Sequence, residues 1–264
     1  MRIDSSAEHS LPPGMIAFRC NVCSAHCAVS LDALSRETGK CPACHTQMRC
    51  RSLVRLLSMR LFGESLDIAD FPSRAQGLMG IGMSDVGRYA EVLPTKMHYI
   101  NTFFHKEPRL DIQHPESEHL GAYDFVISSD VMEHVPPPVS SAFKNLHALL
   151  KVGGVLILTV PFTLNHETEE HFPDLYDYEV VDRNGRQVLI NRTVDGHIQE
   201  YTDLIFHGGP GRTLEMRVFS ESGLLRELEH AGFGDITVHR EPYCDTGIYW
   251  KEPWSVPITA QRLT

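Results

Sequence analysis

Short apolar runs alternate with amphipathic segments over the middle of the chain. The runs are typical of buried strands and lie at GLMGIG (77–82), MHYIN (97–101), YDFVISS (123–129) and VLILTV (155–160). Two amphipathic segments between them predict helices, DVGRYAEVL (85–93) and SSAFKNLHALLKVGG (140–154), the second closed by its two glycines. This alternation predicts an α/β fold built on a doubly wound, mostly parallel sheet.

The pattern changes after residue 162. Two turn signals, Asn184-Gly185 and Asp195-Gly196, separate alternating runs and predict a β-hairpin or a three-stranded meander inserted into the α/β body. We expect the whole of residues 163–215 to form a lid. The α/β pattern then resumes with a helix in FSESGLLRELEHAGF (219–233), capped by Ser220, and with strands at GDITVHR (234–240) and TGIYWK (246–251).

The length and composition suit one large domain and a small module. The chain has 264 residues and a formal net charge of −10, and none of its apolar runs approaches the ~20 residues that a membrane span needs. The first 18 residues lack the basic start and apolar core of a signal peptide, so we expect a cytoplasmic protein. The predicted organisation is a flexible N-terminus (1–17), a small module with a linking helix (18–62) and the α/β domain (63–264).

Four cysteines in the small module have the spacing of a structural zinc site. They form two Cys-x-x-Cys pairs, Cys20 with Cys23 and Cys41 with Cys44. Each pair aims two thiolates at one point, and two such pairs complete a tetrahedron around Zn²⁺. The alternatives are a pair of disulfides or a set of buried thiols, and a reducing cytoplasm disfavours the disulfides. Cys27, Cys50, His26 and His45 lie nearby in the sequence as substitute ligands.

The basic residues are concentrated in this same module. Residues 19–60 contain seven basic and two acidic side chains, a net charge of +5, so the remaining residues carry −15. The segment MRCRSLVRLLSMRLFG (48–63) predicts a helix with an apolar side and a basic side. Its charge either pairs within the protein or meets a phosphate-bearing partner, and the acidic remainder disfavours a general polyanion binder.

Polar residues follow the predicted strand at 123–129. The segment SSDVMEHVPPP places Asp130, Glu133 and His134 directly after a buried strand. Carboxylates and imidazoles are costly to bury without partners, but at the end of a strand they can face a ligand. In an open α/β sheet, ligands bind outside the carboxyl ends of the strands, where Gly80 and Gly82 also lie. That glycine pair alone is equally compatible with a plain tight turn.

The order of these segments resembles the class I S-adenosylmethionine-dependent methyltransferases, and the cysteine-rich front resembles their subgroup with an N-terminal zinc ribbon. In that family a strand ending in Asp is followed by a Glu-His pair, a helix and Leu-Lys-Pro-Gly-Gly. The matching residues here are Asp130, Glu133, His134, Lys151, Gly153 and Gly154. The resemblance covers residues 18–162 and, more loosely, 200–240. It implies a seven-stranded sheet, S-adenosyl-L-methionine as cofactor and a structural Zn²⁺.

The sequence departs from the family pattern at three positions of the cofactor site. Leu78 stands where the glycine loop usually has an acid, and Ser84 where it has a last glycine. The second strand ends at Asn101 instead of an acid that grips the ribose hydroxyls. The resemblance implies that the cofactor contacts Gly80, Gly82, Asn101, Asp111, Asp130 and Glu133.

Two histidines are candidates for the chemistry. The resemblance places His134 beside the methyl group, and His207 lies in a glycine- and proline-flanked turn, HGGPG, which resembles a stretch of the zinc-ribbon methyltransferases. We expect His207 to act as general base or substrate ligand. The alternatives are a histidine that starts a helix and one that caps a loop. The acidic stretch containing His166 and His171 lacks a known metal pattern and is expected to be a solvated loop.

Three functions remain open at this point. The first is O-methylation of a sugar or another small hydroxylated metabolite, which the acidic charge, the lid and the histidines favour. The second is methylation of an RNA base, with the zinc module binding the RNA. The basic charge of the module favours this function, and the acidic charge of the remaining residues disfavours it. The third is a degenerate, non-catalytic scaffold that retains the fold, for which Leu78 and Asn101 speak.

Overall fold

The computed structural model describes residues 12–208 and 213–264. The chain forms two compact units. One comprises residues up to Ser73 together with Val86–Lys96 and Arg240–Lys251, and the other comprises Arg74–Asp85, Met97–His239 and Glu252–Thr264. Most of the N-terminal tail predicted at 1–17 lies outside the described residues. The first strand begins at Met15, inside that predicted tail.

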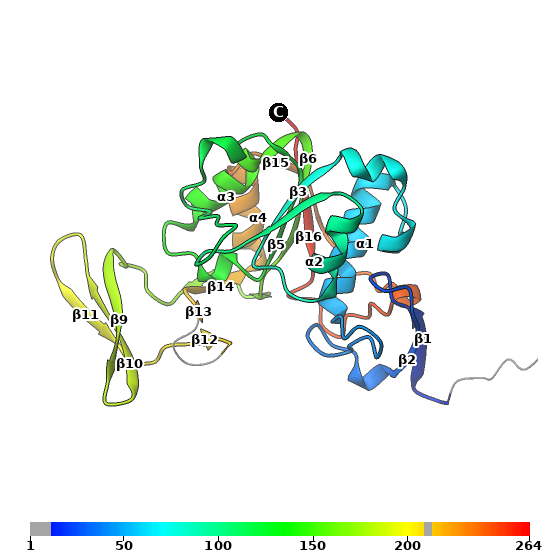
Figure 1. Ribbon diagram of the computed structural model, residues 1–264. Helices are drawn as coiled ribbons and strands as arrows, with labels where there is room; N and C mark the ends of the chain where they lie inside the picture. Colours follow the sequence, from blue (N-terminus) through cyan, green and yellow to red (C-terminus); the bar gives the residue numbers. More distant parts are fainter. Residues whose placement is uncertain (1–11, 209–212) are drawn as a thin grey trace, which may run out of the picture. The chain divides into compact units, whose positions relative to one another are not determined.

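The larger unit is built on a six-stranded sheet with the strand order β15-β16-β6-β5-β3-β4 (Figure 1). Strands β4, β3, β5 and β6 are parallel neighbours, and β16 runs antiparallel to both β6 and β15. The bounds are β3 Met79–Met83, β4 His98–Thr102, β5 Tyr123–Ser129, β6 Leu150–Thr159, β15 Phe233–Val238 and β16 Ile258–Arg262. The predicted α/β class and mostly parallel sheet are therefore confirmed.

The number of strands and the identity of the last strand were predicted wrongly. The sheet has six strands in the described residues, not seven. Residues 103–122 between β4 and β5 contain Pro108 and Pro115 and form turns with one 3-10 segment at Ser117–His119, so they do not supply the long crossover that another parallel strand requires. TGIYWK is not a strand either, and β16 at Ile258–Arg262 takes that place.

Two helices pack side by side on one face of this sheet. Helix α3 spans Val139–Leu149 and α4 spans Glu221–His230 (Figure 1). The predicted cap of α4 is confirmed, because the Ser220 hydroxyl accepts a hydrogen bond from the Gly223 N–H at 3.0 Å. Helix α3 ends before the predicted glycines. Leu150 already belongs to β6, and Gly153, with a φ of +83°, lies within that strand.

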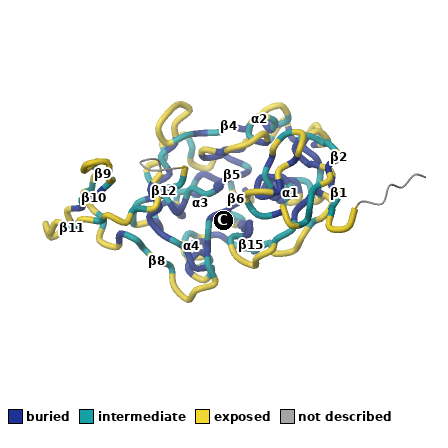
Figure 2. The backbone as a smooth tube through the Cα atoms, turned by 90° about the horizontal axis from the view of Figure 1, so that it is seen from below, coloured by how far each residue is buried: buried dark blue, intermediate teal, exposed yellow. Residues whose placement is uncertain are grey.

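The insertion forms a mostly exposed three-stranded sheet with the order β11-β10-β9 (Figures 1 and 2). Its strands are β9 Asp177–Arg183, β10 Arg186–Arg192 and β11 Ile198–Tyr201, and the two predicted turns lie between them. Short strands connect it to the main body, at β7 Phe162–Thr163, β8 Glu169–Glu170, β12 Phe206–His207, β13 Thr213–Leu214 and β14 Arg217–Ser220. The predicted meander is thus confirmed.

The smaller unit gathers three stretches of chain around helix α1, which spans Met48–Phe62. It also contains the hairpin of β1 (Met15–Arg19) and β2 (His26–Ser30) and the short helix α2 (Arg88–Val92). Leu34, Met48 and Ile248 form its apolar cluster, against which Tyr249 and Trp250 pack. Packing within this unit therefore buries Ile248 of TGIYWK and partly buries Tyr249 and Trp250.

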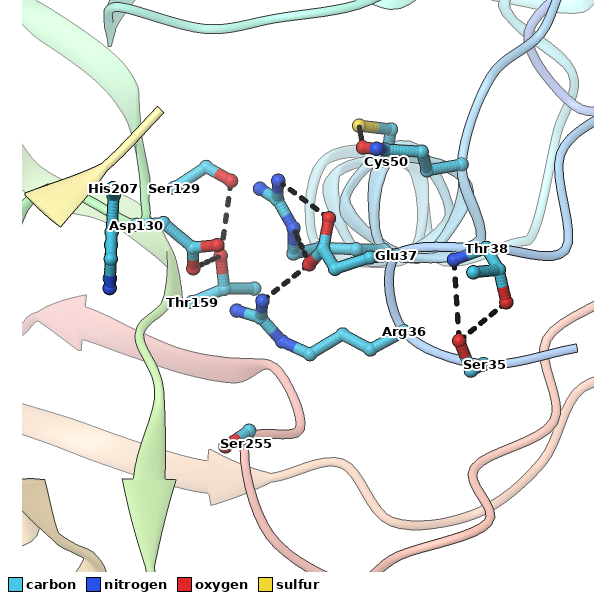
Figure 3. Close-up of polar contacts among 12 residues, drawn as sticks. Ser35, Arg36, Glu37, Thr38, Cys50, Ser129, Asp130, Thr159, His207 and Ser255 are labelled. Atoms are coloured by element: carbon cyan, nitrogen blue, oxygen red, sulfur yellow. Dashed lines mark hydrogen bonds and ion pairs between the residues drawn. The ribbon is translucent and has the colours of Figure 1, made fainter. Parts of the chain in front are cut away.

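Several arginines of the smaller unit form ion pairs or hydrogen bonds within that unit. Glu37 accepts hydrogen bonds from Arg36 and Arg49 (Figure 3). Arg19 pairs with Asp67 at 2.7 Å. Arg51 is fully buried, so the predicted basic side of the helix is not a solvated face. This favours internal pairing over a phosphate-bearing partner as the use of the basic charge. No helix in the described ranges has the length and apolar character needed to cross a membrane.

Candidate active site

Asp130 lies directly after the carboxyl end of β5, where the chain takes an unusual backbone conformation. Its φ is +55°, in the left-handed region that non-glycine residues rarely adopt. Its N–H donates to the Thr159 carbonyl at 2.8 Å, and its Oδ1 accepts from the Thr159 hydroxyl at 3.1 Å (Figure 3). The neighbouring strand β6 therefore holds the Asp130 carboxylate in place at the edge where ligands of α/β sheets bind.

The next turn carries the predicted Glu133 and His134 and is fastened by β14. Met132–His134 form a 3-10 turn in which the Glu133 side chain is fully buried. The buried guanidinium of Arg217 donates to the carbonyls of Met132, at 3.0 Å, and Val135, at 2.6 Å. The Met216 N–H donates to the Glu133 carbonyl at 2.8 Å. A segment more than eighty residues later in the chain thus fixes the turn.

The structure brings the two predicted histidines together. The Nδ1 of His207 lies 3.0 Å from the Nε2 of His134, and their rings meet edge to face with centroids 4.6 Å apart. The Nδ1 of His134 contacts the Leu214 carbonyl at 2.9 Å. Burial lowers the pKa of His134, and the hydrogen bond to Leu214 opposes this shift in part. The neutral form of His134 is therefore favoured near pH 7.

Two further residues complete the cluster, and sequence reasoning missed them. Glu215 is buried and bridges two imidazoles, with its Oε2 2.8 Å from the Nε2 of His207 and its Oε1 2.9 Å from the Nε2 of His171. His171 had been assigned to a solvated loop. Glu170, from the same stretch, pairs with the buried Arg217 at 2.6 Å. The only sequence signal was the closeness of Glu215 to the HGGPG turn.

The two glycines of the predicted cofactor turn are required by close packing. A Cβ at Gly80 would lie 1.9 Å from the Phe125 ring. A Cβ at Gly82 would collide with the Asp85 carboxylate and the Tyr99 hydroxyl, which hydrogen-bond to each other. These contacts are a structural reason for both glycines in addition to the predicted cofactor contact.

A family comparison identifies the larger unit. The sequence of residues 79–238 matches the family described as a methyltransferase domain. The chain belongs to this family. It is a class I S-adenosylmethionine-dependent methyltransferase, as the resemblance implied. A comparison with curated protein sequences found no match.

Several solved methyltransferase structures are similar to this chain at low sequence identity. A methyltransferase from Mesorhizobium loti is 15% identical over 74% of this chain and 94% of that chain, with a TM-score of 0.43. The sugar N-methyltransferase KedS8 from a Streptoalloteichus species is 12% identical over 81% and 86%, with a TM-score of 0.44. The CurJ carbon methyltransferase is 16% identical over 75% of this chain but only 51% of that chain, with a TM-score of 0.43.

Two residues at the predicted cofactor site of this methyltransferase differ from the family pattern. One of them keeps the backbone conformation that the family pattern requires, and the other has a different contact. Ser84 stands where the family has a glycine and has a φ of +55°, so it adopts the conformation that a glycine would adopt. The amide of Asn101 is engaged at both ends by Asp85, accepting from its N–H and donating to its carbonyl, each at 2.9 Å. Asn101 therefore fastens the glycine loop, where the family's acid would hold the ribose.

The remaining predicted cofactor residue, Asp111, lies in a turn of the same unit. Its Oδ1 accepts from the Gln113 N–H at 3.0 Å, and its Oδ2 lies 3.5 Å from the Nδ1 of His114. The carboxylate is about a quarter exposed. It is therefore held by its own turn with part of its surface open to a ligand.

The four predicted cysteines of the smaller unit converge on one point. The sulfur atoms of Cys20, Cys23, Cys41 and Cys44 all lie within 4.8 Å of one another. The Cys20–Cys44 and Cys23–Cys41 separations are 3.8 Å and 3.7 Å, and four sulfurs about 2.3 Å from a zinc ion would be about 3.8 Å apart. All seven cysteines lie in the described ranges, and none forms a disulfide.

Backbone amides support the cysteine cluster. Burial raises the pKa of Cys20, and the backbone N–H groups of Cys23 and Val22 oppose this shift in part. At Cys41 burial also raises the pKa, but the N–H groups of Cys44 and Ala43 help to lower it to about 7. Such N–H groups stabilise thiolates, the form that binds metals. Cys27 is a fifth sulfur nearby, 3.5 Å from Cys41, but it lies outside the set of four that converges.

Proposed function

We propose that this methyltransferase transfers a methyl group to a hydroxyl of a sugar or another small metabolite in the cytoplasm. The observation that carries the proposal is the His134–His207 pair beside the carboxyl end of β5. An alcohol must lose a proton to become a methyl acceptor, and histidine is the side chain whose ordinary pKa suits that task near neutral pH. An amine acceptor could simply be bound unprotonated and would need no such pair.

The residues at the strand ends have separable roles in this proposal. Asp130, the Gly80–Gly82 turn and Asp111 hold S-adenosyl-L-methionine, which supplies a methyl group already activated on a sulfonium sulfur. The methyl carbon bonds to the acceptor oxygen, the carbon–sulfur pair stays on sulfur, and the hydroxyl proton leaves. His207 either accepts this proton or holds the oxygen while the proton passes to water. Glu215 and Leu214 orient the two imidazoles.

The charge of the smaller unit supports a small acceptor over a nucleic acid. Three of its arginines, Arg36, Arg49 and Arg51, are engaged within the unit, and Arg55 lies 4.0 Å above the Tyr243 ring. Few of these charges remain to meet phosphates. We propose that the four converging cysteines hold a structural Zn²⁺, as in the zinc-ribbon subgroup, because four thiolates leave no position for a substrate.

Calorimetric titration with S-adenosylhomocysteine tests the proposal at its first step. We expect saturable binding by the full chain, and weaker binding by at least tenfold for Asp130→Ala. The matched control Asp195→Ala changes an exposed carboxylate of the insertion and should leave the affinity unchanged. Release of S-adenosylhomocysteine with panels of sugars and of amines then distinguishes hydroxyl from amine acceptors. Absence of binding at millimolar ligand would favour the non-catalytic scaffold.

A further inference from the structure

The hydrogen bonds around the two histidines determine which nitrogen of each ring carries a proton. A backbone carbonyl can only accept, so the Nδ1 of His134 must donate to Leu214. The Nε2 of His207 lies 2.8 Å from a carboxylate oxygen of Glu215 and donates to it. In the neutral state, the other two nitrogens, His134 Nε2 and His207 Nδ1, therefore both carry lone pairs.

Those two lone-pair nitrogens face each other at 3.0 Å. Two acceptors at that distance repel, so a cation must lie between or beside them. The buried carboxylate of Glu133 strengthens this requirement, because its Oε1 lies 3.8 Å from the first nitrogen and 3.9 Å from the second. The cation is either a single shared proton or a metal ion.

The spacing of the three atoms matches a metal ion. Atoms separated by 3.0, 3.8 and 3.9 Å lie on a circle with a radius of about 2.1 Å, which is the length of a typical metal–nitrogen or metal–oxygen bond. The outer contacts match as well, because imidazoles that bind metals usually donate their other N–H to a carbonyl or a carboxylate. His134 does the first and His207 the second.

We propose that Glu133, His134 and His207 bind a divalent transition-metal ion. Two imidazoles and one carboxylate suit ions from manganese to zinc, and three protein ligands leave further positions open. His207 is 38% exposed, so the site opens toward solvent on its side. Glu215 acts as a positioning residue, which orients His207 from outside the site.

A metal ion at this site would also narrow the class of methyl acceptors. This part of the inference rests on the proposed function. An acceptor hydroxyl bound at an open position has a lowered pKa, so it can lose its proton to water without either imidazole accepting it. His207 is then a metal ligand instead of the general base. Acceptors with two neighbouring hydroxyls would be favoured, because both oxygens can bind the ion at once.

Titration of the purified full chain with Mn²⁺, followed by electron paramagnetic resonance, tests the site directly. Mn²⁺ is chosen because thiolate clusters select softer ions, so the four-cysteine site does not compete for it. We expect one Mn²⁺ per chain and pulsed spectra with couplings to imidazole nitrogen. Glu133→Gln and His207→Asn should each weaken the affinity at least 100-fold, and Glu215→Gln about 10- to 100-fold.

A control variant and a folding measurement separate loss of the metal site from loss of the fold. His197→Asn, which removes an exposed imidazole 3.3 Å from Asp195, should leave the Mn²⁺ affinity unchanged. Glu133 is fully buried, so its substitution can impair folding, whereas substitution of the partly exposed His207 carries less of this risk. Thermal melting shows whether both variants are folded. Absent Mn²⁺ binding, or binding unaffected by both ligand variants, would overturn the metal site. Titration of the same samples with S-adenosylhomocysteine shows separately whether the proposed function stands.

Discussion

Two single residues carry backbone strain at the ends of neighbouring parallel strands. Ser84 follows β3 and Asp130 follows β5, and both have a φ of +55°. A non-glycine residue in this region costs on the order of 1 kcal/mol or more. Strained residues of this kind are common in ligand-binding turns, and both positions lie at the carboxyl edge of the sheet, where the cofactor of this family binds.

Replacing Ser84 by glycine should stabilise the protein. Ser84 is exposed, so Ser84→Gly removes no packing and relieves the strain, and we expect a gain of about 1 kcal/mol in the free energy of unfolding. Urea denaturation followed by circular dichroism measures this change. Lys144→Gly, at an exposed position inside α3, is the matched control and should lose about 1 kcal/mol. An equal loss in the free energy of unfolding for both variants would contradict the assignment of backbone strain to Ser84.

The site was predictable from sequence only where its residues are close in the chain. Asp130, Glu133 and His134 follow one buried strand, so the local pattern was sufficient to group them. Glu215 joins His171 to His207 across the fold, and no periodicity relates residues so far apart in the sequence. The role of Asn101 was also beyond prediction, because its engagement with Asp85 depends on how the end of β4 meets the loop after β3.

At the scale of elements, buried arginines connect segments that are distant in the chain. Arg217 joins β14 to the turn that carries Glu133, and Arg51 joins α1 to residues 246–247. Arginine suits this use because its planar guanidinium offers several donors in a fixed fork. The pattern of α1 could not distinguish a buried arginine from a solvated one, since both alternate with leucines in the same way.

Removing the Arg51 guanidinium should destabilise the smaller unit strongly. Its three donors reach the carbonyls of Thr46, Thr246 and Gly247 at 2.7–2.8 Å in a fully buried position. Arg51→Met keeps much of the side-chain volume but leaves these carbonyls without donors, so we expect a loss of at least about 3 kcal/mol. Thermal and urea unfolding measure it. Lys40→Met, which removes one exposed positive charge, should change stability by less than about 0.5 kcal/mol.

Strands were predicted better than the ends of elements and the count of strands. The sequence predicts β3, β5 and β6 clearly, because both faces of these strands are buried and their residues are therefore mostly apolar. The end of α3 was misplaced because Gly153 serves a bend within β6, and glycine marks either feature. The strand predicted at TGIYWK was wrong because its apolar side chains pack against Leu34 and Met48, which are far away in sequence, instead of in the sheet.

At the scale of the whole molecule, a cysteine cluster and a methyltransferase sheet occupy separate compact units of one chain. The smaller unit contains a local apolar cluster of Leu34, Met48 and Ile248, in addition to buried apolar residues of α1 such as Leu53 and Leu57. A bound zinc ion would add its binding free energy to the folding free energy of this unit. Metal content and folding of this unit should therefore change together.

Loss of one cysteine of the four should release the zinc. We expect Cys41→Ser to lower the zinc content from one ion per chain to below about one tenth and to reduce the melting temperature, because metal binding and folding are coupled. Elemental analysis and calorimetry measure the two effects. Cys50→Ser is the matched control, since the Cys50 sulfur contacts Gln47 and the Val86 carbonyl instead of the cluster. Full zinc content in Cys41→Ser would contradict the assignment.

The assembly of the smaller unit from three chain stretches has a consequence for biosynthesis. Arg51 leaves the ribosome 195 residues before Thr246, whose carbonyl it binds. At typical rates of synthesis this delay is about 10 to 40 s. During that time α1 carries a charged guanidinium and apolar side chains that have no final partner. Until residues 240–251 have been translated, the nascent N-terminal segment therefore lacks two of the three carbonyl partners of Arg51.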